Sequence, residues 1–174
     1  NFCVVVDDAE MRVTHVLRGD DHLANTPRQI LLYQALGYGL PAFGHVPLIL
    51  GPDKARLSKR HGAMAVTAYR DLGFLPEAVV NYLARLGWSH GDQEIFTRDE
   101  LVAAFNVEAI GKSAGVFDVE KMRWVNWSHL KALAPDTLVR VARPYLAAAG
   151  FTGSGDDAWL AKALVTLQER AQTL

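Results

Sequence analysis

The sequence changes character near residue 66, and this change limits the possible folds more than any other feature. Before it, short apolar runs rich in β-branched residues alternate with helix signals. We expect strands at 2–6, 13–18 and 45–50, and a helix over 26–36 with Thr26 as its N-cap, Pro27 in its first turn and Gly37 as its terminator. This β-β-α-β order predicts half of a doubly wound α/β sheet.

After residue 66 the strand-like runs disappear, and signals for helix starts and stops follow one another. Thr97 and Glu100 match a capping box, Asp118 is a suitable N-cap, and Gly87 and Gly150 are suitable terminators. We expect helices over 76–86, 97–105, 118–125 and 135–149, and a last one from 157 to the end. The second part is therefore predicted to be all-α, with the short connections typical of packed helices.

The overall composition sets limits on compartment and partners. The formal net charge is −1, so the chain lacks the overall basic character expected of a protein that coats DNA. No apolar run approaches the roughly 18 residues of a membrane span. The single cysteine, Cys3, lies in the first predicted strand and has no disulfide partner, which fits the cytoplasm. Because the chain opens without Met directly on that run, we expect it to be part of a longer protein.

The most basic segment is the loop at 51–62, which has Gly at both ends and carries Lys54, Arg56, Lys59, Arg60 and His61. A loop of this kind can close over a polyphosphate, because cations stabilise charge that builds on phosphate oxygens in a transition state. It can equally be a solvated basic turn, and composition alone favours the turn.

A second polar segment, Arg18-Gly19-Asp20-Asp21-His22, lies where a predicted strand passes into a loop. Ligands of open α/β sheets bind outside the carboxyl ends of strands, and an arginine there can form a forked contact with a carboxylate. The alternative is a charged turn that caps the following helix. Two later segments, 81–89 and 116–126, are expected to be mostly core, although Lys121 and Arg123 could face a nucleic acid backbone. No zinc-protease, nucleophile-elbow or P-loop motif occurs.

Together these segments resemble a known family. Arg56-Leu57-Ser58-Lys59-Arg60 is similar to the KMSKS signature loop of class I aminoacyl-tRNA synthetases, in the K-L-S-K-R form of glutamyl enzymes. Arg56 replaces the first Lys and Arg60 replaces the final Ser. The flanking segments follow the bacterial glutamyl-tRNA synthetase pattern in order, at 16–22, 25–29, 47–52, 58–62, 73–78, 81–83, 86–89 and 117–118. The resemblance covers nearly the whole chain and fades after about residue 135.

The resemblance implies a fold and a division into domains. Residues 1–65 would be the C-terminal part of a Rossmann-like catalytic domain that carries the KMSKS-type loop. Residues 66–134 would be a helical stem-contact domain, and 135–174 the start of a truncated helical anticodon-binding domain.

The resemblance also implies an activity: ATP-dependent formation of glutamyl-adenylate, then transfer of the glutamyl group to the 3′-terminal adenosine of tRNA-Glu. Arg18 would bind the side-chain carboxylate of L-glutamate, and Asp21 falls at an acidic position near ATP and the acceptor end. Backbone groups of Leu48 and Ile49 would hold adenine. Lys59 would meet the phosphates, with Arg56 and Ser58 beside it.

Other expectations complete this hypothesis. Mg²⁺ would come with ATP, and we expect no protein-bound metal, DNA or membrane partner, a cytoplasmic location and a monomer. Arg170 is a candidate for an arginine that reads the anticodon. The family's other signature, of the His-Ile-Gly-His type, would lie upstream, so we expect this chain alone to be inactive.

Three alternatives stay open. A shortened paralogue that glutamylates a tRNA base lacks the anticodon domain, and the long helical part argues against it. Glutaminyl-tRNA synthetase continues into β-barrels, which an all-α reading of 90–174 disfavours. A non-catalytic RNA-binding module of the same fold would have no need to keep Arg18, Asp21 and Lys59 together.

Overall fold

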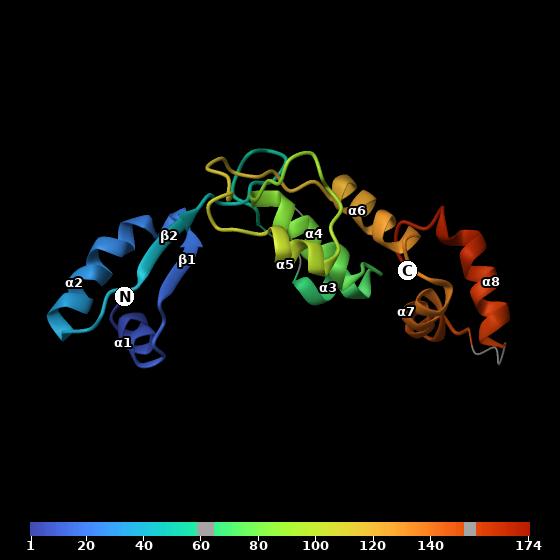
Figure 1. Ribbon diagram of the computed structural model, residues 1–174, viewed down its shortest axis with the longest axis horizontal. Coiled ribbons are helices and arrows are strands. Elements are labelled where there is room, and N and C mark those ends of the chain that lie inside the picture. The colour runs from blue at the N-terminus through green and yellow to red at the C-terminus, as the bar shows by residue number, and fades with distance from the viewer. Residues whose placement is uncertain (59–64, 152–155) are drawn as a thin grey trace.

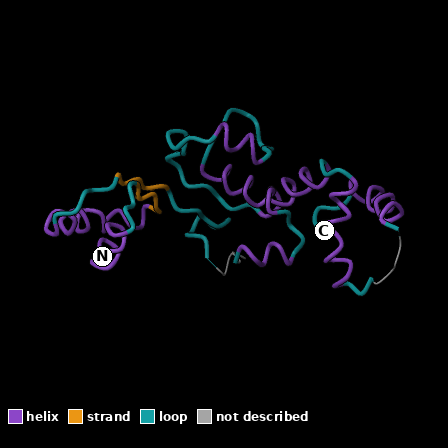
Figure 2. Tube along the Cα trace, turned by 60° about the horizontal axis from the view of Figure 1, so that its bottom comes forward, coloured by secondary structure: helices purple, strands orange, loops and turns teal. Residues whose placement is uncertain are grey.

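The computed structural model describes residues 1–58, 65–151 and 156–174. The elements follow one another along an elongated arch, from an α/β unit at the N-terminus, through a central group of helices, to a pair of helices near the C-terminus (Figure 1). In the described part of the chain, the two named strands belong to the N-terminal unit (Figure 2). No helix of that part is long and apolar enough to cross a membrane.

The α/β unit is built on two parallel strands, β1 (His15–Gly19) and β2 (Ala42–Val46). They pair from His15 opposite Ala42 to Gly19 opposite Val46. A 3-10 helix, η1 (Asp20–Asn25), and α2 (Thr26–Leu36) connect them. A parallel pair needs such a crossover, because a tight turn can only join antiparallel strands. The prediction of a partial α/β, Rossmann-like unit is therefore confirmed at this level.

The predicted strand at 2–6 is wrong, because this run is the start of α1 (Phe2–Glu10). Only Val5 of the helix is buried, and Cys3 is exposed rather than in a core. A short apolar run does not by itself distinguish a buried strand from a helix. Here contacts with α2 accompany the helix: Gln29 Nε2 donates to Asn1 Oδ1 at 3.1 Å, and the Tyr33 hydroxyl donates to Asp8 Oδ2 at 3.4 Å.

Two local details of this unit also differ from prediction. The strand expected at 45–50 is β2, which lies earlier and ends before Pro47, a residue that has no N–H to donate to a ladder. Helix α2 ends as predicted at Gly37, in a left-handed conformation with φ of 71°. Its N-cap, however, is Asn25, and Thr26 is the first helical residue.

The central group consists of α3 (Val66–Asp71), α4 (Pro76–Gly87), α5 (Arg98–Ala104) and α6 (Val119–Lys131). Two predicted caps are confirmed: Thr97 and Glu100 form a capping box, and the Asp118 carboxylate accepts from the N–H groups of Glu120 and Lys121. Tyr82, Phe117, Met122 and Val125 are among the buried residues that pack α4 against α6. The predicted helices of this part are thus present, and α3 is added to them.

The last two helices are α7 (Pro135–Ala148) and α8 (Asp157–Gln168). Helix α8 stops before the chain end, where we had expected a continuous helix, and the segment after it returns to the central group. The Leu174 N–H donates to the Gly73 carbonyl at 2.9 Å, and Asn126 Nδ2 donates to the Gln172 carbonyl at 2.6 Å. The segment after α8 is therefore held against the central group, at Gly73 and at Asn126 of α6.

Candidate active site at the carboxyl ends of the strands

Arg18 lies near the carboxyl end of β1, directly opposite His45 of β2. Its Nη2 donates to Thr26 Oγ1 at 2.7 Å, and its Nε lies 3.5 Å from His45 Nε2. The guanidinium carbon lies 5.5 Å from the centre of the Phe43 ring, within the range of a cation–π contact. Hydrogen bonds therefore hold one edge of the Arg18 guanidinium, and the Phe43 ring lies against its flat face.

Asp21 lies in η1, just after β1, and its carboxylate reaches the basic loop. Asp21 Oδ2 is 3.1 Å from Arg56 Nη2. The Asp21 side chain is 27% exposed and that of Arg56 is 66% exposed, so water weakens this ion pair. Gly19 makes room for the carboxylate, because a Cβ at that position would lie 2.6 Å from Asp21 Oδ1. Two segments far apart in sequence therefore meet at the end of β1.

The basic loop begins with a tight turn. The Gly51 N–H donates to the Ala55 carbonyl at 2.8 Å, and Lys54 adopts a left-handed conformation with φ of 61°. After the turn, the Leu57 N–H donates to the Ile49 carbonyl at 2.9 Å. Arg56 and Ser58 are exposed, whereas Leu57 packs on the central core. The chain therefore fixes the loop at Leu57 and presents its neighbours to solvent.

The other predicted site residues are divided between this region and the far end of the molecule. Leu48 lies beside Gly19, where a Cβ would come within 3.1 Å of Leu48 Cδ2. Lys59 and Arg60, the remaining residues of the KMSKS-type segment, lie outside the described residues. Arg170 is exposed in the turn that follows α8, the helix at the far end of the arch from β1 (Figure 1).

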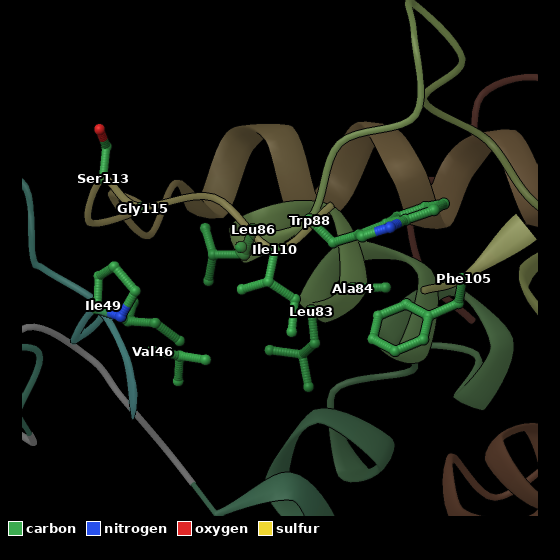
Figure 3. A pocket seen from close by; sticks show the side chains of 12 residues that line it. Val46, Ile49, Leu83, Ala84, Leu86, Trp88, Phe105, Ile110, Ser113 and Gly115 are labelled. Atoms are coloured by element: carbon green, nitrogen blue, oxygen red, sulfur yellow. The ribbon is translucent and has the colours of Figure 1, made fainter. Parts of the chain in front are cut away.

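Two hollows border the strand ends. One, of about 470 Å³, has Asp20, His45, Glu108 and Lys112 among its lining residues. The other, of about 250 Å³, lies between α4 and the segment after β2, with Leu83 and Leu86 on one side and Val46 and Ile49 on the other (Figure 3). Both hollows are lined mainly by apolar groups, and the first also has the charged side chains of Asp20, Glu108 and Lys112 in its lining.

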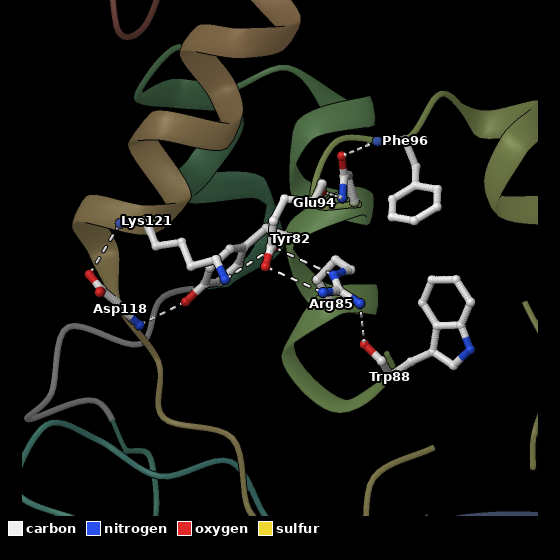
Figure 4. Close-up of polar contacts among 8 residues, drawn as sticks. Tyr82, Arg85, Trp88, Glu94, Phe96, Asp118 and Lys121 are labelled. Atoms are coloured by element: carbon white, nitrogen blue, oxygen red, sulfur yellow. Dashed lines mark hydrogen bonds and ion pairs between the residues drawn. The ribbon is translucent and has the colours of Figure 1, made fainter. Parts of the chain in front are cut away.

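A separate charged cluster lies in the central group, around Glu94 (Figure 4). Arg85 Nη2 lies 3.3 Å and Lys121 Nζ lies 3.1 Å from its carboxylate oxygens. Burial acts to raise the pKa of Glu94, but Arg85 and Lys121 outweigh it, so that the pKa lies below its ordinary value. Lys121, which was predicted as a possible contact of a nucleic acid backbone, therefore forms an ion pair with Glu94 and remains partly exposed.

Two residues of the site, His45 and Thr26, were not predicted to belong to it from the sequence. His45 lies directly across from Arg18 only because of the strand register, and Thr26 Oγ1 lies 2.9 Å from His45 Nε2. Thr26 was expected to cap α2, yet its hydroxyl contacts Arg18 and His45 instead. A polar residue at the first turn of a helix is so often a cap that no sequence signal separates the two roles.

Comparison with known proteins shows where these segments recur. Residues 1–124 match the family model described as tRNA synthetases class I (E and Q), catalytic domain. Over 174 residues the chain is 60% identical to the glutamate–tRNA ligase of Syntrophobacter fumaroxidans, and it is 59% identical to that of Geobacter sulfurreducens. All of this chain is aligned in both cases, but it spans only 37% of the length of each relative.

A solved structure of a glutamate tRNA ligase also matches this chain. The crystal structure of a glutamate tRNA ligase from Elizabethkingia meningosepticum, in complex with its amino acid, superposes with a TM-score of 0.85 at 32% sequence identity. The superposition covers 99% of this chain and 38% of that chain. The similarity therefore extends along the whole chain but over little more than a third of that structure.

Proposed function

Since the chain belongs to the class I tRNA synthetases for glutamate and glutamine, we propose that it forms part of a glutamate–tRNA ligase. The observation that carries the proposal is the contact between Asp21 and Arg56, which joins the segment after β1 to the basic loop. A polyphosphate ligand at this place would meet cations from the loop, and an amino acid would meet Arg18.

The reaction has two steps. An oxygen of the α-carboxylate of glutamate attacks the α-phosphorus of ATP, the bond from that phosphorus to the oxygen bridging to the β-phosphate breaks, and pyrophosphate leaves. The 2′-hydroxyl of the terminal adenosine of tRNA-Glu then attacks the glutamyl carbonyl, and AMP leaves. Mg²⁺ enters with ATP as part of the substrate, and in the described part of the chain no group of three or more His, Cys, Asp or Glu side chains is placed to hold a metal ion.

Arg18 is proposed to bind the side-chain carboxylate of glutamate. A guanidinium presents parallel N–H groups that match the two oxygens of a carboxylate. Glutamine presents one oxygen and one NH₂ group, so the same fork would leave a donor facing a donor. Asp21 is proposed to lie near ATP and the acceptor end, where it also sets the position of Arg56 through their ion pair.

The loop is proposed to act on the phosphates through Lys59, with Arg56 and Ser58 beside it. The bond between the Leu57 N–H and the Ile49 carbonyl supports this, because it fixes the start of the loop to the segment proposed to hold adenine. Adenine would contact backbone groups of Leu48 and Ile49 beside this bond. The adenine and phosphate sites would then be joined through one turn.

For the rest of the chain we propose that 66–134 contacts the tRNA stem and that 135–174 begins an anticodon-binding domain, with Arg170 as a candidate contact. In the described part of the chain, all named elements after residue 90 are helices, which supports this over the glutaminyl alternative, for which β-barrels are expected. We further propose that the whole protein is a cytoplasmic monomer.

Glutamate-dependent exchange of pyrophosphate into ATP, measured on the full-length protein with tRNA-Glu present, tests the proposal. Wild-type protein should exchange with glutamate and not with glutamine. Lys59→Ala should lower the rate at least tenfold, because it removes a charge from the transition state. Lys54→Gln is the matched control, since it removes a cation from the same loop away from the KMSKS-type segment. Tight tRNA binding without any exchange would instead favour a non-catalytic module.

A further inference from the structure

Thr26 is a buried hydroxyl with charged and aromatic neighbours, which is unusual for the first residue of a helix. Its side chain and backbone are only 8% exposed. The hydroxyl oxygen lies 2.7 Å from Arg18 Nη2 and 2.9 Å from His45 Nε2. Three side chains from β1, α2 and β2 therefore meet at one oxygen atom.

The chemistry of the guanidinium fixes the direction of one of these hydrogen bonds. A guanidinium can only donate, so Thr26 Oγ1 accepts from Arg18. The hydroxyl also lies 3.4 Å from the His22 carbonyl, to which it can donate, so its contact with His45 Nε2 is a hydrogen bond in either tautomer of the imidazole. Arg18 Nε also approaches the same Nε2, at 3.5 Å.

These bonds involve one edge of the Arg18 guanidinium and do not involve the other edge. Nε and one N–H of Nη2 form the side edge, which faces His45 and Thr26. The end of the fork, formed by Nη1 and the second N–H of Nη2, takes no part in either bond. A carboxylate needs two such parallel donors. Phe43 lies against the flat face of the guanidinium and restricts its rotation.

We propose that Thr26 and His45 are positioning residues, which hold Arg18 with the end of its fork turned toward the side-chain carboxylate of the amino-acid substrate. This inference rests on the proposed function of Arg18. An arginine side chain has many rotamers, and holding one of them before the ligand arrives removes an entropy cost from binding. Thr26 and His45 should therefore affect the binding of glutamate and its separation from glutamine, and not the binding of ATP.

The test is steady-state pyrophosphate exchange by the full-length protein with tRNA-Glu, with glutamate and ATP varied separately. Thr26→Val keeps the shape of the side chain and removes the hydroxyl. We expect it to raise the KM for glutamate about tenfold, the effect of one lost hydrogen bond to a charged group. The KM for ATP should stay within about twofold, because the phosphate contacts are untouched.

Conservative variants separate positioning from folding. Thr26→Ser restores the hydroxyl and should return the KM for glutamate to within about twofold of wild type, whereas a purely steric role would not be rescued. His45→Gln keeps an acceptor and should be milder than His45→Leu, which removes it. If Thr26→Val unfolds at a lower temperature, the His45 pair supplies the same comparison without changing the start of α2.

The outcomes also separate this inference from the proposed function. No glutamate-dependent exchange by the wild type would overturn the proposed function. Normal exchange with an Arg18→Ala variant of unchanged KM for glutamate would remove the role of Arg18, and the inference with it. An active wild type and a defective Arg18→Ala, together with an unchanged KM in Thr26→Val and His45→Leu, would overturn the inference alone.

Discussion

The guanidinium of Arg56 lies 3.1 Å from the carboxylate of Asp21, although the two residues come from separate segments of the chain. The contact brings the basic loop to the end of β1. Because both side chains are partly exposed, the ion pair positions the basic loop and contributes little to the free energy of unfolding.

Removing this ion pair should therefore change stability little and activity more. In a double-mutant cycle of Arg56→Ala and Asp21→Ala, we expect a coupling in the free energy of unfolding below about 1 kcal/mol. The coupling should shrink in 1 M salt, which screens exposed charges. Urea unfolding measures it, and a salt-independent coupling above about 2 kcal/mol would show that the pair is buried in solution.

Asn126 should be one of the most sensitive positions for stability. It is fully buried, its Oδ1 accepts from the Leu75 N–H at 2.7 Å, and its Nδ2 donates to the Gln172 carbonyl at 2.6 Å. Asn126→Ala leaves both backbone groups without these partners, so we expect a loss of about 2–4 kcal/mol in the free energy of unfolding. Gln93→Ala removes an exposed amide bond to the Ile95 carbonyl and serves as the control, with an expected loss below about 0.5 kcal/mol.

Gly73 and Gly150 offer a matched pair of substitutions, because both have φ of 83°. A Cβ at Gly73 would lie 2.4 Å from the Leu174 carbonyl oxygen, whereas a Cβ at Gly150 would meet nothing within 4 Å. Gly150→Ala should therefore cost only the backbone strain, about 1 kcal/mol. Gly73→Ala should also release the end of the chain.

Hydrogen exchange distinguishes these two effects. In Gly73→Ala, the Leu174 N–H should exchange faster, because its bond to the Gly73 carbonyl is lost. In Gly150→Ala its exchange should match that of the wild type. Equal protection of Leu174 in both variants would mean that the chain end is not seated on Gly73 in solution.

The buried His129 should make stability depend on pH below neutrality. Burial lowers its pKa, an effect that the charge of Glu77 partly opposes, and its Nε2 lies 2.9 Å from Asn81 Oδ1. The folded state therefore binds a proton less readily than the unfolded state. The stability from this group is fully present above the unfolded pKa, about 6.5, and is lost as pH falls below it.

The comparison of wild type with His129→Gln isolates this effect. Gln can still donate to Asn81 but does not titrate. Between pH 7 and pH 5.5, the wild type should lose more unfolding free energy than the variant, by at most about 1.4 kcal/mol per pH unit for one proton. Parallel pH profiles of the two proteins would contradict the assignment.

The local signals in the sequence were sufficient for most helices. Thr97 and Glu100 close their capping box, Asp118 caps α6, and Gly37 ends α2, because each of these bonds joins residues within one turn of each other. Residues 2–6 show where local signals fail. An apolar run of that length satisfies either a strand or a helix, and the bonds of Gln29 and Tyr33 to α1 are made with Asn1 and Asp8, which lie outside the run.

The family, the division into an α/β part and a helical part, and the segments around Arg18 and Arg56 were all predictable from the amino-acid sequence. The folded chain was needed to see that His45 faces Arg18, that Thr26 contacts both of them instead of capping a helix, and that Asp21 pairs with Arg56. The two groups of features differ in the distance along the chain between the residues involved. A cap is fixed by neighbours within a few residues, whereas a cross-strand partner depends on a register that the whole crossover between β1 and β2 sets.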